Sequence, residues 1–185
     1  MNPHDAKLLL ANSEILFTAA EVNAATSRVA REINRDFADK HPLILSVMGG
    51  AVVFSGQLLP QLNFPLDFDI VQVSRYGEKT VGTQLNWRVA PRDNIVGRNV
   101  IILDDILDEG ITLAAIVDLV KSNGAKSVAC AVFCTKDYGE EINNKKPLKA
   151  DYVGISVPNR FIYGYGMDVS GAWRNLPAIY AAKGK

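Results

Sequence analysis

The sequence contains few of the residues that mark secreted and zinc-binding proteins. It has 185 residues, of which only two are cysteines and two are histidines. Two cysteines cannot make the disulfide framework of a small secreted protein, and no spacing here is typical of a Cys/His metal site. We therefore expect a reducing, cytoplasmic setting, and we interpret Cys130 and Cys134 as small buried residues.

An excess of charge of one sign is also missing, because 20 lysines and arginines balance 20 aspartates and glutamates. A protein that holds nucleic acid or an anionic membrane through a general basic field carries a surplus of positive charge. The balance argues against nucleic acid and membrane as partners, although it does not exclude a local basic patch.

The sequence lacks a long uninterrupted apolar segment as well. Residues 42–66 carry no charge, but glycines, prolines and polar residues interrupt them. This pattern fits a buried strand, a turn and a helix better than a helix that faces lipid. The first residues show no basic region followed by an apolar core, so we expect no secretory signal either.

Alternating strand and helix patterns run along the chain, without internal repeats or linkers. Apolar runs predict strands at residues 43–47, 68–73, 99–103 and 127–134. Amphipathic patterns predict helices at about residues 19–40, 51–62 and 112–122, the first with a capping box from Thr18 to Glu21. Such alternation implies a mostly parallel sheet, whose ligands gather at the carboxyl ends of the strands. We expect residues 151–157 and 161–163 to form short strands outside this sheet.

A cluster of carboxylates follows the third predicted strand. Four of the twenty acids lie within six residues: Asp104, Asp105, Asp108 and Glu109. Carboxylates this close repel one another and are costly to desolvate, which indicates a ligand with hydroxyl donors, a bound cation, or both. The turn through Gly110 into a helix near Thr112 offers backbone N–H groups to a phosphate. A solvated acidic loop that caps the helix is the alternative, and composition alone does not separate the two.

This acidic segment resembles the signature for 5-phosphoribosyl-1-pyrophosphate (PRPP) of the type I phosphoribosyltransferases. In that family a hydrophobic strand, two acids, two apolar residues, Asp, Thr, Gly and a later Thr follow in this order, and every element but one is present. The exception is Glu109, which stands where the family usually has threonine. Either Glu109 points away from the 5-phosphate, or phosphate binding differs there.

The resemblance implies roles for these residues. Asp104 and Asp105 hold the ribose hydroxyls, and backbone N–H groups up to Thr112, with its hydroxyl, hold the 5-phosphate. Asp108 is the catalytic residue that exchanges a proton with purine N7. The implied PRPP- and phosphate-binding residues are Gly49, Gly50, Asp104, Asp105, Asp108, Glu109, Gly110, Ile111, Thr112 and Arg174.

Further segments resemble one branch of the family, the hypoxanthine-guanine phosphoribosyltransferases. They are Lys136, Tyr152-Val153-Gly154, Pro158, Phe161-Ile162, Gly164-Tyr165-Gly166, Asp168 and Arg174-Asn175-Leu176-Pro177. The resemblance implies that Lys136 donates to the 6-oxo group of a purine, that Phe161 stacks on the base, and that the backbone of Ile162 reads its edge. It also implies that Asp168 holds Mg²⁺ through water and that Arg174 contacts pyrophosphate. Considered singly, Lys136 would be interpreted as a surface lysine and Phe161 as a core residue.

The segment Met48-Gly49-Gly50 occupies the position of the family's pyrophosphate loop, with one departure. The family commonly has a lysine where this chain has Met48, so one positive charge is missing. Backbone amides of the two glycines can still approach pyrophosphate closely. The family often has a cis peptide bond in this loop, and we expect it at Val47–Met48.

A third departure lies in the predicted flexible catalytic loop, residues 74–83. Ser74, Arg75 and Tyr76 match the start of this loop, but Arg75 replaces the family's serine. One hypothesis is that Arg75 restores the charge missing at Met48 when the loop closes. An exposed loop arginine without such a role is the alternative.

The resemblance implies a fold of the α/β class, the type I phosphoribosyltransferase fold. A mostly parallel sheet flanked by helices forms a core of about residues 19–140, and a small hood is built from about residues 1–18 and 141–185. We expect residues 1–185 to form a single domain. Family members are commonly oligomers, so a homodimer or homotetramer is expected.

The function implied is purine salvage. The enzyme would transfer the 5-phosphoribosyl group from PRPP to N9 of hypoxanthine or guanine, giving IMP or GMP and pyrophosphate, with Mg²⁺ held by Asp105 and Asp168. One alternative is a non-catalytic regulator that senses PRPP or nucleotides on the same fold. Another is a generic nucleotide-binding module with an acidic magnesium loop, although such a module leaves the C-terminal matches unexplained.

Overall fold

The computed structural model describes residues 1–75 and 85–183. Tyr76 and the rest of the predicted loop, up to residue 83, lie outside the described residues, as do the side chains of Ser74 and Arg75. The helices are α1 (Pro3–Ala11), α2 (Ala19–Phe37), α3 (Val52–Leu58), α4 (Ile111–Ser122) and α5 (Glu140–Asn143), with 3₁₀ turns at Leu59–Gln61 and Asp93–Ile95. The strands are β1 (Ser13–Phe17), β2 (Leu43–Met48), β3 (Asp67–Arg75), β4 (Leu85–Val89), β5 (Asn99–Leu107), β6 (Ser127–Asp137), β7 (Tyr152–Pro158), β8 (Ile162–Tyr163) and β9 (Ile179–Ala182).

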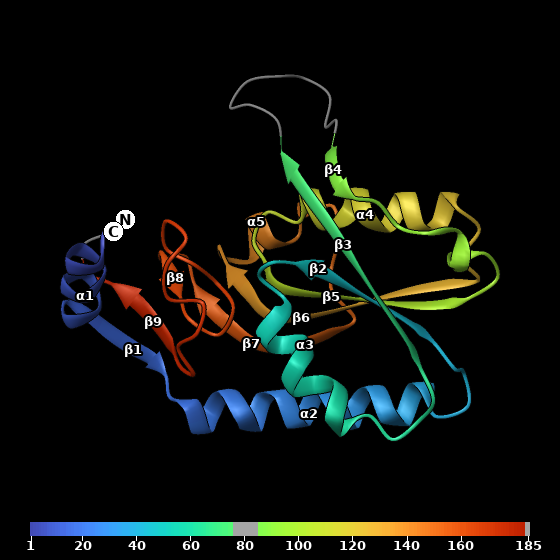
Figure 1. Cartoon of the computed structure of the whole chain (residues 1–185), viewed down its shortest axis with the longest axis horizontal. Helices are drawn as coiled ribbons and strands as arrows, with labels where there is room; N and C mark the ends of the chain where they lie inside the picture. Colours follow the sequence, from blue (N-terminus) through green and yellow to red (C-terminus); the bar gives the residue numbers. More distant parts are fainter. Residues whose placement is uncertain (76–84, 184–185) are drawn as a thin grey trace.

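The larger sheet has the order β4-β3-β2-β5-β6-β7. All neighbours in it are parallel except the edge pair β3–β4, which is antiparallel. Figure 1 shows α2 and α3 covering one face of this sheet and α4 the other. The predicted mostly parallel sheet with flanking helices is therefore confirmed.

Local sequence signals set the helices and strands. The hydroxyl of Thr18 accepts a hydrogen bond from the Glu21 N–H (3.4 Å), and the Glu21 carboxylate accepts one from the Thr18 N–H (2.8 Å), which completes the predicted capping box of α2. The apolar run of β2 is buried along nearly its whole length, as expected for a central strand of a parallel sheet.

The prediction that residues 151–157 lie outside the core sheet is wrong. They form β7, which pairs in parallel with β6 at one edge of the sheet. The core therefore continues past residue 140 as far as Pro158. The physical reason is that the connection between the two strands holds only a four-residue helix, α5, so the strand–helix rhythm that marks a crossover is absent.

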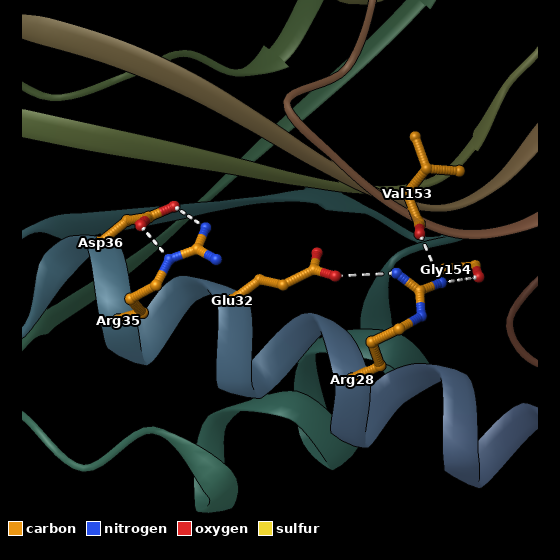
Figure 2. Close-up of polar contacts among 6 residues, drawn as sticks. All are labelled: Arg28, Glu32, Arg35, Asp36, Val153 and Gly154. Atoms are coloured by element: carbon orange, nitrogen blue, oxygen red, sulfur yellow. Dashed lines mark hydrogen bonds and ion pairs between the residues drawn. The ribbon is translucent and has the colours of Figure 1, made fainter.

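Charged side chains join α2 to the edge strand β7. Figure 2 shows the guanidinium of Arg28 donating to the carbonyl oxygens of Val153 (3.0 Å) and Gly154 (2.6 Å), while it also pairs with Glu32. One helical turn after Glu32, Asp36 accepts a hydrogen bond from the hydroxyl of Tyr152 at 2.9 Å. These contacts hold β7 against α2 in addition to apolar packing.

The terminal segments form a smaller antiparallel sheet with the order β1-β9-β8, next to α1. The hydroxyl of Tyr163 on β8 donates to the Ser13 hydroxyl at 2.7 Å, and the indole N–H of Trp173 donates to the Ala6 carbonyl at 2.8 Å. Tyr165 reaches the other way, to the Thr26 hydroxyl on α2, at 2.8 Å. The first two contacts hold the terminal segments together, and the buried contact between Tyr165 and Thr26 joins them to α2.

Both cysteines are buried on β6, as predicted. Burial raises the pKa of the Cys130 thiol to about 12, and burial likewise raises the pKa of Cys134. Since the thiolate is the reactive form, we expect an aromatic disulfide reagent at pH 8 to leave both thiols of the native protein unmodified. In denaturant the same reagent should titrate two thiols per chain. Rapid reaction of the native protein would contradict this packing.

No helix in the described ranges is long and apolar enough to cross a membrane.

Candidate active site

The residues of the site come together because parallel strands end at the same edge of the sheet. Gly49 and Gly50 follow β2, Lys136 lies at the end of β6, and Phe161 follows β7. The acidic segment lies at the end of β5, between β2 and β6 in the sheet. The carboxyl edge therefore gathers most of the residues that the sequence indicated.

Asp104 and Asp105 belong to β5 itself, since this strand runs on to Leu107 rather than ending at Leu103. Desolvation, together with repulsion from Asp105, holds the pKa of Asp104 well above its ordinary value. Desolvation also raises the pKa of Asp105, while the hydrogen bond with Asp104 and the charge of Arg174 act in the opposite direction. Two adjacent carboxyl groups with raised pKa values favour ligands that bring positive charge or hydroxyl donors.

Gly50 lies directly against the Asp105 carboxylate. A Cβ at position 50 would lie 1.8 Å from Oδ2 of Asp105, closer than any real contact, and a Cβ at Gly166 would lie 2.1 Å from the Gly50 carbonyl oxygen. The loop after β2 is therefore packed between β5 and the C-terminal segment. The cis peptide bond of this loop is Met48–Gly49, one residue later than the predicted Val47–Met48.

Arg174 is held beside this loop. Its guanidinium donates to the carbonyl oxygen of Gly166 at 2.6 Å and forms an ion pair with Asp168 at 2.5 Å. Asp168 in turn accepts a hydrogen bond from the N–H of Gly171 at 2.6 Å. The positive charge of Arg174 also acts on Asp105, so it lies where an anion bound near the Gly50 loop would meet it.

A cavity of about 190 Å³ opens at the ends of β5 and β6. It is lined by Asp105, Ile106, Asp108, Lys136, Phe161, Ile162, Met167 and Asp168. Nζ of Lys136 lies 3.2 Å from Oδ2 of Asp108, which places a donor and an acceptor side by side. Ile162 is buried, whereas 43% of Phe161 is exposed, so its ring is available to a flat ligand.

A second cavity of about 180 Å³ adjoins the first and shares Ile106 and Asp108 with it. It is lined by Asp104, Ile106, Leu107, Asp108, Glu109, Gly110, Thr112 and Leu113. Gly110 has a φ of 83° and occupies the N-cap position of α4, whose first N–H groups have no partner within the helix. The cavity therefore combines a positive helix end with the Asp104 carboxyl.

Glu109, the departure from the family pattern, borders two cavities. It lines the second cavity, at the start of α4, and also a neighbouring cavity of about 270 Å³. Lys145 and Lys146 line that neighbouring cavity too. The negative charge of Glu109 thus has lysines beside it.

Not every predicted residue lines these two cavities. Gly49, Gly50 and Arg174 are absent from both linings, although Gly50 contacts Asp105, and Arg174 contacts Asp168. Ile111, the first residue of α4, is absent as well. These residues border the Asp105 end of the site or support it through the backbone.

Sequence reasoning missed Tyr138. Its hydroxyl donates to Oδ1 of Asp108, the oxygen that Lys136 does not contact. A signal was available, because Tyr138 follows Lys136 by two residues, and that spacing in an extended segment puts both side chains on the same side.

The carboxylates of the site fit a magnesium ion better than a zinc ion. Among the side chains that the structure describes, no three of His, Cys, Asp or Glu gather closely enough to hold a metal. Mg²⁺ needs no such set, since it keeps several waters and takes one or two carboxylates together with substrate phosphates. Asp105 and Asp168 line the same cavity and supply that number of carboxylates.

Comparison with known proteins identifies relatives over nearly the whole chain. The chain is 33% identical to the hypoxanthine-guanine phosphoribosyltransferase of Bacillus subtilis, over 92% of this chain and 93% of that protein. It is 35% identical to the bifunctional protein TilS/HprT of Listeria innocua, over 90% of this chain. The chain spans only about a quarter of the length of that bifunctional relative (25%).

Solved structures with the same fold carry related names. The hypoxanthine-guanine phosphoribosyltransferase of Bacillus anthracis aligns with a TM-score of 0.81 at 28% identity, covering 91% of this chain and 97% of the other. The hypoxanthine phosphoribosyltransferase of Trypanosoma cruzi aligns with a TM-score of 0.84 at 30% identity, covering 94% and 97%. These matches confirm the fold class expected from the sequence.

A family model described as the phosphoribosyl transferase domain matches residues 13–170. The resemblance drawn from the acidic segment and the C-terminal motifs is therefore confirmed, and the chain belongs to the phosphoribosyltransferase family.

Proposed function

We propose that this chain is a hypoxanthine-guanine phosphoribosyltransferase of purine salvage. It transfers the 5-phosphoribosyl group from PRPP to N9 of hypoxanthine or guanine and yields IMP or GMP and pyrophosphate. The names of the relatives support this proposal. They do not favour the alternative of a PRPP-sensing regulator.

The observation that carries the proposal is the pair formed by Lys136 and Asp108. Their donor and acceptor atoms lie 3.2 Å apart in a cavity that also offers the ring of Phe161. A 6-oxopurine presents an acceptor, O6, next to a donor, N7–H. The ammonium group can donate to O6 while the carboxylate accepts from N7–H, so the pair recognises one edge of the base.

The reaction is a substitution at the anomeric carbon of PRPP. The bond from C1 to the pyrophosphate oxygen breaks, the bond from C1 to purine N9 forms, and the N7 proton passes to Asp108. Charge develops on the ribose ring in an oxocarbenium-like transition state, so the protein must position the reactants and stabilise the leaving group. Asp108 lies in the lining of both cavities, which suits a group that acts where base and ribose meet.

The remaining groups bind PRPP. Asp104 and Asp105 accept hydrogen bonds from the ribose hydroxyls, and the start of α4, from Gly110 to Thr112, holds the 5-phosphate. Arg174 and the amides of the Gly49–Gly50 loop contact pyrophosphate. Asp105 and Asp168 would hold Mg²⁺, which would supply positive charge next to the pyrophosphate group.

We also propose a localisation, a domain organisation and an oligomeric state. The chain is a cytoplasmic protein with a single domain over residues 1–185, and it assembles as a homodimer or homotetramer.

A pyrophosphate-release assay with a panel of bases tests the function. With PRPP and Mg²⁺, we expect release with hypoxanthine and with guanine and none without a base. Adenine carries an amino group at C6, so the Lys136 ammonium would face a donor. The kcat/KM for adenine should therefore be at least about 10²-fold lower than that for hypoxanthine. Absence of release with every purine would overturn the proposal in favour of a binding protein.

A further inference from the structure

The carboxylate of Asp108 is held by two donors from the same stretch of chain. Lys136 donates to Oδ2, and the hydroxyl of Tyr138 donates to Oδ1. Each oxygen of this carboxylate therefore has one side-chain donor, and both donors come from the end of β6 and the residue after it.

Tyr138 is itself fixed by a short network. Its N–H donates to the side-chain oxygen of Asn143 at 3.2 Å. The Asn143 amide and the Gly139 N–H both donate to Oδ1 of Asp137, at 2.7 and 2.8 Å. Lys146 donates to the Lys136 carbonyl at 2.6 Å, with its ammonium 5.2 Å from the centre of the Tyr138 ring. The turn through α5 thus holds the Tyr138 hydroxyl at a defined place.

Binding of a purine makes the two donors unequal. In the proposed complex, N7–H of the base donates to Oδ2 of Asp108, and the Lys136 ammonium turns to O6. The contact between Lys136 and Asp108 is then shared with substrate, whereas the contact from Tyr138 to Oδ1 faces no substrate atom and persists. Tyr138 is the donor that remains on Asp108 throughout the proton exchange.

We propose that Tyr138 is a positioning residue for the reaction, whose hydroxyl holds the Asp108 carboxylate in the orientation that accepts the N7 proton. This proposal rests on the proposed function of Asp108. It assigns a role to a residue in the segment between β6 and β7, outside the motifs that carry the family resemblance.

The surroundings keep the Tyr138 hydroxyl protonated. Burial, followed by the hydrogen bond to Asp108, raises the pKa of Tyr138 to about 12, so it remains a donor over the working pH range. The charged groups near Tyr138 and Asp108 include Lys136, Asp137, Lys145, Lys146 and Glu109, and Asp105 and Asp168 line the same cavity as Asp108. Tyr138 and Lys136 each donate a hydrogen bond to the Asp108 carboxylate.

The test compares two tyrosine-to-phenylalanine variants that each remove a hydrogen bond to an aspartate. Tyr138→Phe removes the donor to Asp108, and Tyr152→Phe removes the donor to Asp36, which lies on α2 (Figure 2). For Tyr138→Phe we expect kcat to fall about tenfold with the KM for PRPP unchanged. Tyr152→Phe should change neither kcat nor the KM for PRPP.

The outcomes distinguish a positioning role of Tyr138 from a purely structural role and from a failure of the proposed function. A kcat that stays at the wild-type value in Tyr138→Phe would overturn the proposal. A loss of kcat that comes with a higher KM for PRPP and a lower melting temperature would also overturn it, since that result indicates a structural role only. Wild-type protein is assayed alongside, so absence of base-dependent pyrophosphate release from the wild type would identify a failure of the proposed function instead.

Discussion

Replacing Asp108 with asparagine is expected to lower kcat for pyrophosphate release by about 10²- to 10⁴-fold, the usual contribution of a general acid or base. The KM for PRPP should change far less, because the residues proposed to bind ribose and phosphate stay in place. The substitution preserves side-chain size and an oxygen that accepts from the Tyr138 hydroxyl. It removes the carboxylate that accepts the N7 proton, which is the reason for the asymmetric effect.

Asp118→Asn serves as the matched control for this prediction. Asp118 is an exposed residue on α4, within the same strand–helix unit, and it lines neither of the cavities at the end of β5. Its replacement removes one carboxylate without touching the site, so kcat and both KM values should stay within twofold of wild type. Equal losses in kcat and in PRPP affinity for Asp108→Asn would count against the acid/base role and favour a role in binding alone.

Much of this fold was readable from local sequence signals. The capping box at Thr18, the buried apolar run of β2 and the glycine at the N-cap of α4 are each determined by a few neighbouring residues. Such features are dictated by backbone sterics and by burial, and those constraints act over short stretches of chain. The strand β7 was misplaced because its assignment depends on pairing with β6 rather than on its own pattern.

The sequence predicted which residues form the site, but it did not predict which of them contact one another. The cluster around Asp104 and Asp105 stood out because four acids rarely follow a buried strand so closely. Tyr138, the partner of Asp108, was missed, because its contact joins residues 30 positions apart in the sequence. The packing of Gly50 against Gly166 was invisible, because only the folded chain brings those two backbones together.

The same packing makes Gly50→Ala the second substitution with a large expected effect. The added methyl group would lie 1.8 Å from the Asp105 carboxylate, which is itself held by a hydrogen bond from the Ile106 N–H at 2.9 Å. Either the carboxylate or the loop must move, and a displacement of about 1 Å in a positioned site costs about 10² in kcat/KM. We therefore expect kcat/KM for PRPP to fall at least that far, together with a loss of about 1–3 kcal/mol in the free energy of unfolding.

Gly56→Ala is the control, because no atom lies within 4 Å of a Cβ at that position in α3. Activity should be retained in this variant, and the free energy of unfolding should rise by up to about 1 kcal/mol, since alanine favours a helix more than glycine does.

A double variant tests whether the contact between the added methyl group and the Asp105 carboxylate causes the loss in Gly50→Ala. Asp105→Gly removes the atoms that the methyl group meets, so in its presence Gly50→Ala should cost little stability while activity stays low. If Gly50→Ala is equally destabilising with and without the Asp105 side chain, the contact between the two residues is not the cause, and this account of the pyrophosphate loop is wrong.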